Sequence, residues 1–106
     1  MKKRKADVSK NLDTPERQKD FIGKAIATGD ADAIRDALGL VARKRGMTDI
    51  ATATNLNRES LYRSLGSGGN PEFATVMKVM KALGLRLSIA LDKATSTRAG
   101  RGRSSA

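Results

Sequence analysis

Side chains that can bind the edges of DNA bases cluster in the short segment 57–65. Asn57 can cap a helix that runs to about Leu65, with Leu61 and Leu65 on its inward face. The other faces of this helix then carry Arg58, Glu59, Ser60, Tyr62, Arg63 and Ser64. Arginine can pair with guanine, and glutamate can accept a hydrogen bond from cytosine N4. The segment therefore predicts a helix that reads double-stranded DNA in the major groove.

A first short helix has to position this second helix. Thr48 can cap a helix that ends at Thr54, and the small Ala51 at its middle lets the second helix pack closely. Asn55 tolerates the left-handed backbone of a sharp turn. Residues 46–69 therefore predict a helix-turn-helix. The predicted DNA contacts come from Thr48, Asn57, Arg58, Glu59, Ser60, Tyr62 and Arg63.

The alternative interpretation of this segment is a plain helical hairpin in a small bundle. Thr54 is polar where an apolar residue often stands, and residues 46–69 carry no net charge. Both features favour the hairpin. The basic ends of the chain favour DNA, because flexible cationic arms can supply attraction to phosphates.

Charge and composition narrow the classes of function. The net charge is +10, of which residues 1–24 and 93–106 supply +8. The chain has no His and no Cys, which excludes zinc-finger ligation and Ser–His or Cys–His catalysis. We therefore expect no enzyme, no metal and no cofactor, and we interpret Asp30, Asp32 and Asp36 as a solvated helix start. Without an apolar run of about 18 residues no membrane span is expected, and the lack of Cys suits the cytoplasm.

The remaining elements follow from caps and periodicity. Residues 1–13 read as a disordered basic arm and residues 93–106 as a disordered basic tail, on either side of one domain over 14–92. Further helices are expected at 15–28, at 31–45, and from Asn70-Pro71-Glu72 to Gly84. The helical spacing in this last helix predicts core positions at Phe73, Val76, Met77, Met80 and Leu83.

The segment after Gly84 alternates apolar and polar residues. Period two over residues 85–91 predicts a β-strand, and nothing else in the sequence reads as a strand. Two copies pairing antiparallel across a two-fold axis would satisfy both strand edges and match two half-sites on DNA. The predicted homodimer interface consists of Leu85, Leu87, Ile89 and Leu91.

Residues 30–91 resemble a known family, the addiction-module antidote proteins. The resemblance rests on VARKRGM, on NRESLYRSL and on GNPEFATVMKVMKALGL. These proteins are bacterial antitoxins of the Xre, lambda-repressor-like helix-turn-helix class. The resemblance implies a five-helix DNA-binding domain, a small RelE-like toxin as partner, and binding to the chain's own promoter. Asn55 departs from the glycine usual in the family, and the basic tails lie outside the family pattern.

The sequence thus predicts a mainly α fold, a five-helix lambda-repressor-like helix-turn-helix domain with one C-terminal β-strand. The predicted function is an antitoxin that represses its own operon and neutralises a RelE-like toxin. Two alternatives stay open. One is a phage-type transcriptional regulator without a toxin, and the other is a protein-interaction module that has lost DNA binding.

Overall fold

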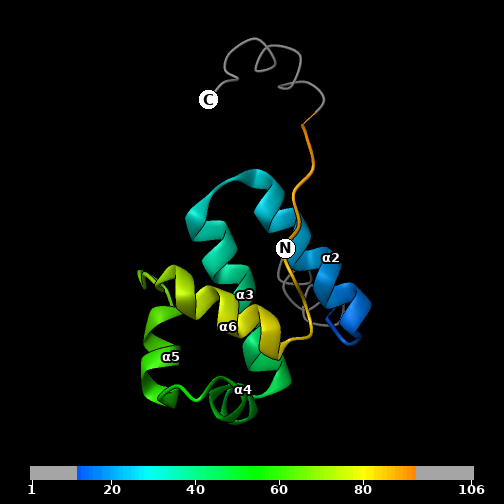
Figure 1. Cartoon of the computed structure of the whole chain (residues 1–106). Coiled ribbons are helices and arrows are strands. Elements are labelled where there is room, and N and C mark those ends of the chain that lie inside the picture. The colour runs from blue at the N-terminus through cyan, green and yellow to red at the C-terminus, as the bar shows by residue number, and fades with distance from the viewer. Residues whose placement is uncertain (1–11, 93–106) are drawn as a thin grey trace, which may run out of the picture.

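Five helices make up the part of the chain that the computed structural model describes, residues 12–92. They are α2 (Pro15–Thr28), α3 (Ala31–Arg45), α4 (Met47–Thr54), α5 (Arg58–Ser64) and α6 (Phe73–Ala82). The helix α6 crosses α3, with α4 and α5 at one end of the molecule and α2 on the other side (Figure 1). The predicted mainly α fold is confirmed. The predicted tail at 93–106, and all but the last two residues of the predicted arm, lie outside the described residues.

The caps read from the sequence set the bounds of α2 and α3. The Thr14 hydroxyl accepts a hydrogen bond from the Arg17 amide, and Pro15 occupies the first helical position. Gly29 ends α2 at a φ of +74°. Asp30 caps α3 by accepting from the Asp32 amide. The predicted bounds 15–28 and 31–45 are confirmed.

Two helix starts differ from the prediction. The helix α4 begins at Met47, so Thr48 lies in its first turn and is not its cap. Burial of Met47 against the core explains the earlier start. The helix α6 begins at Phe73 and not at Pro71, because Glu72 keeps an extended backbone with ψ of 153°. Asn70 and Pro71 belong instead to the loop that joins α5 to α6.

One hydrophobic core lies between the helices. Its fully buried large side chains come from all the helices except α4, from the chain just before α2 and from the residue that ends α5. They are Leu12, Ile22, Leu38, Val41, Leu61, Leu65 and Val79. Because Leu12 is buried and Asp13 forms an ion pair with Lys44 at 3.1 Å, the fold begins earlier than the predicted boundary at residue 14. None of the helices within residues 12–92 is long and apolar enough to cross a bilayer.

The predicted C-terminal strand is wrong. Gly84, at a φ of +80°, ends α6 by reversing the chain, and the Leu85 amide then donates to the Met80 carbonyl. Residues 85–92 follow without helix or strand structure and run up beside α2 (Figure 1). A strand exists only as part of a ladder, and no other segment within 12–92 pairs with this one.

The predicted core of α6 is only partly correct. Met80 and Leu83 are buried, whereas Met77 is 38% exposed and Phe73 is 72% exposed. Because the helix starts at Phe73, the aromatic ring has no preceding turn of helix to pack on. The helix α6 therefore presents an aromatic side chain to solvent at its N-terminus.

Candidate nucleic-acid interface

The turn between α4 and α5 depends on two polar residues. Asn55 adopts the left-handed conformation, with φ of +61° and ψ of 36°, as its residue type predicted. The Leu56 amide then donates to the Ala51 carbonyl at 3.1 Å, and the Leu56 side chain packs against the core. Thr54 is buried, but its hydroxyl donates to the Ile50 carbonyl at 2.8 Å. A polar residue at this position is therefore compatible with a closely packed two-helix unit.

The cap and the core contacts of α5 fix which of its faces is free. The Asn57 side-chain oxygen accepts from the Ser60 amide at 2.9 Å, as predicted for a cap. Leu61 and Leu65 are 1% exposed and hold the helix to the core. The opposite faces of α5 therefore point to solvent.

All seven residues predicted to contact DNA are exposed on this unit. They are Thr48 on α4 and, from the cap and the free faces of α5, Asn57, Arg58, Glu59, Ser60, Tyr62 and Arg63. Exposure on one unit makes all seven available to a ligand.

Arg58 connects the exposed residues of the two helices. Its Nη1 lies 3.4 Å from the Thr48 hydroxyl, and its guanidinium lies 5.7 Å from the centre of the Tyr62 ring. The spacing of Arg58 and Tyr62, four residues apart on a helix, was the only sequence signal of this contact. These contacts restrict the arginine and reduce the entropy it would lose on binding.

Glu59 and Arg63 are the unengaged charges of α5. Within residues 12–92 neither side chain forms a hydrogen bond or an ion pair. Both side chains are exposed, so both are open to contact with base edges or phosphates. A free guanidinium and a free carboxylate can together select a guanine and a cytosine.

Arg35 holds the loop after α5 and was not singled out by the sequence. Its guanidinium donates to the Gly69 carbonyl at 3.0 Å and to Asp32 and Asp36 on its own helix. The hydrogen bond to Asp36 raises the pKa of Arg35 above its usual range. Asp32 and Asp36 were interpreted as exposed acids at a helix start, and in the structure both also accept hydrogen bonds from Arg35. No group of three possible metal ligands converges anywhere in residues 12–92.

Comparisons with known proteins extend over most of the chain. A family model described as "Probable addiction module antidote protein" matches residues 2–91. The chain is also similar to an uncharacterized protein of Haemophilus influenzae, with 41% identity over 83 residues. This match covers 78% of the present chain and 86% of the relative. No solved structure matches the chain.

Proposed function

The chain belongs to the family of probable addiction module antidote proteins, and from this membership we propose that it is an antitoxin that also reads DNA. An antidote acts on a toxin, so a toxin is its partner. We propose further that the chain binds its own operator through α5, represses its own operon and neutralises a small RelE-like toxin. It is a binding protein with no catalytic role.

One observation carries the DNA-binding part of the proposal. The helix α5 presents Arg58, Glu59 and Arg63 to solvent at the end of a two-helix unit, beside a left-handed turn at Asn55. This arrangement fits a helix that enters the major groove with its first residues against base edges. The unit carries no excess of positive charge, so its contribution is to select bases and not to attract DNA.

Binding to duplex DNA tests this assignment. We expect the chain to bind a duplex from its own upstream region more tightly than a scrambled duplex. Arg58→Ala and Arg63→Ala together should abolish most of this preference, since one base-reading contact is worth about 1–3 kcal/mol.

The matched control is Arg17→Ala with Lys24→Ala, which removes the same charge from exposed positions of α2. This control should weaken binding to both duplexes alike and keep the preference. If the α5 double variant binds every duplex as the wild type does, α5 does not read DNA and a pure protein-interaction module is the better description.

Co-expression tests the toxin part of the proposal. A small RelE-like reading frame beside the gene should arrest growth when it is expressed alone, and the present chain should relieve that arrest. The Arg58→Ala, Arg63→Ala variant should still relieve it, because toxin binding does not require base reading. A specific operator without any neighbouring toxin would instead identify a phage-type transcriptional regulator.

A further inference from the structure

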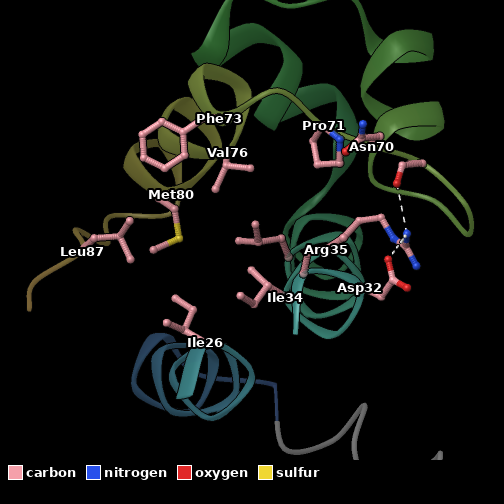
Figure 2. A pocket seen from close by; sticks show the side chains of 13 residues that line it. Ile26, Asp32, Ile34, Arg35, Asn70, Pro71, Phe73, Val76, Met80 and Leu87 are labelled. Atoms are coloured by element: carbon pink, nitrogen blue, oxygen red, sulfur yellow. Dashed lines mark hydrogen bonds and ion pairs between the residues drawn. The ribbon is translucent and has the colours of Figure 1, made fainter. Parts of the chain in front are cut away.

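An apolar groove lies between α2, α3 and α6, away from the exposed face of α5. Its volume is about 340 Å³. Figure 2 shows Phe73, Met80 and Leu87 at one end, Ile26 and Ile34 along its floor, and Asp32 and Arg35 at the other end. Most of the side chains that line this space are apolar. Such a groove favours an apolar occupant over water.

The side chains that border the groove are unusually exposed for their type. Phe73 at the mouth is 72% exposed, and Leu87 is 39% exposed. Two and four residues after Leu87, Ile89 and Leu91 are 97% and 84% exposed. Large apolar side chains gathered in this way are typical of a surface that binds another protein surface.

The far end of the groove is acidic. Asp32 and Arg35 line it, and Asp30 and Asp36 lie close enough to act on the Arg35 guanidinium. Three carboxylates against one guanidinium leave this end negative. An occupant with apolar side chains followed by cations would therefore match the groove in both hydrophobicity and charge.

The chain itself contains a segment of that chemistry. Leu87, Ile89 and Leu91 alternate with smaller or polar residues, and the sequence after residue 92 carries four lysines or arginines and no acid. In its own molecule Leu87 already lines the groove, while residues 85–88 also lie beside Ile22 and Gly23 of α2. Ile89 and Leu91 thus remain outside the groove that they would fit.

We propose that the groove is the docking site for residues 89–91 of a second copy of the chain. Each copy inserts its segment into the groove of the other about a two-fold axis, which covers the exposed side chains of both copies. The interaction depends on burial of Ile89 and Leu91 beneath Phe73, and it requires no β-ladder. It does not depend on DNA binding, because α5 takes no part in it.

Sedimentation equilibrium of the full chain without DNA tests the proposal. The wild type should be dimeric at tens of micromolar, a rough working range for a stable dimer. Ile89→Ser with Leu91→Ser should raise the dimer dissociation constant at least about tenfold, and so should Phe73→Ser on the groove side. Because all three side chains are exposed, these variants should fold, which circular dichroism can check.

The matched control is Ala90→Ser. In an extended segment neighbouring side chains point to opposite sides, so residue 90 faces away from the groove if residues 89 and 91 enter it. This variant should dimerise like the wild type. A monomeric wild type, or a dimer that neither set of serine variants weakens, overturns the proposal and assigns the groove to another occupant.

Cysteine cross-linking distinguishes exchange between copies from folding back within one copy, because the chain has no cysteine of its own. An equimolar mixture of Ile89→Cys and Phe73→Cys chains should form a mixed disulfide dimer on oxidation, and a mixture of Ala90→Cys and Phe73→Cys should form far less. If the disulfide instead forms only inside a chain that carries both Ile89→Cys and Phe73→Cys, the segment serves its own groove and the proposal fails.

Discussion

At Gly39 the backbone of α3 lies close to Leu65, at the end of α5. A β-carbon built at this position would lie 2.5 Å from the Leu65 carbonyl oxygen, which is backbone and cannot move away easily. Helix propensity alone favours alanine over glycine by about 1 kcal/mol. We expect the clash to exceed this gain, so that Gly39→Ala lowers the free energy of unfolding by about 1–3 kcal/mol.

Urea denaturation of Gly39→Ala and Gly23→Ala separates the effect of the clash from the effect of helix propensity. Gly23 lies in α2, and a β-carbon there meets nothing within 4 Å. Gly23→Ala should therefore stabilise the protein by about 0.5–1 kcal/mol, as helix propensity alone predicts. Equal gains in the two variants would show that α3 and α5 are not so closely packed.

Asn55 provides a second test at the level of single residues. Asn55→Gly should change the free energy of unfolding by less than about 0.5 kcal/mol, because glycine adopts positive φ freely but leaves a more flexible unfolded chain. Asn55→Val should lose about 1–2 kcal/mol, since a β-branched side chain is strained in the left-handed region. Thermal unfolding of the two variants measures the difference, and similar melting temperatures would contradict the assigned turn.

In the candidate site, the sequence predicts the local backbone features but not the contacts between side chains. The cap at Asn57 and the conformation of Asn55 follow from residue type, so they could be predicted. The burial of Thr54 looked unfavourable in sequence, because nothing there shows that its hydroxyl reaches the Ile50 carbonyl. The link between Arg58 and Thr48 was equally hidden, because it depends on how α4 and α5 pack.

At the level of elements, local sequence signals predicted where α2 and α3 begin and end. They did not predict the start of α6 or the structure of the segment after Gly84. The bounds of α2 and α3 follow from caps that act within a few residues. Asn70 and Pro71 form an equally good local signal for the start of α6. In the structure they belong to the loop before α6, and the hydrogen bond from Arg35 to the Gly69 carbonyl holds this loop against α3. The alternation of residues after Gly84 indicates a segment with one apolar and one polar face. A β-strand also needs a second strand to pair with, and the alternation carries no information about such a partner.

Arg45 connects α3 to α2 and to the end of α6 through hydrogen bonds. From the end of α3 it donates to the Gln18 side chain of α2 at 2.8 Å and to the Leu83 carbonyl after α6 at 2.9 Å. Arg45→Met keeps the aliphatic stem but leaves both acceptors without this donor. We expect a loss of about 1–3 kcal/mol in the free energy of unfolding.

The neighbouring Arg43 is the control for this variant. It lies on the same helix and is exposed, and within residues 12–92 its side chain forms no hydrogen bond or ion pair. Arg43→Met should stay within about 0.5 kcal/mol of the wild type in chemical denaturation. A similar loss in both variants would mean that charge near the end of α3, and not the bridge between helices, stabilises the fold.

For the whole molecule, the distribution of charge separates attraction from recognition. Residues 12–92 carry a net charge of +2, whereas residues 1–11 and 93–106 each carry +4. Leu12 and Asp13 belong to the fold, so a deletion that spares every core side chain of residues 12–92 stops at residue 11. We expect the ends to strengthen DNA binding on every sequence and α5 to supply the preference among sequences.

Deletion of residues 1–11 and 93–106 tests this division of roles. Binding should weaken on operator and scrambled duplexes alike, and the plot of log affinity against log salt should become flatter by about 0.9 for each phosphate that the ends neutralise in the full chain. The ratio of operator to scrambled affinity should remain. A duplex with a single half-site keeps any change in dimerisation from entering the comparison. An unchanged salt slope would rule out binding of phosphates by the ends, and attraction to DNA would then have to come from cations of the folded part, such as Arg43 and Arg63.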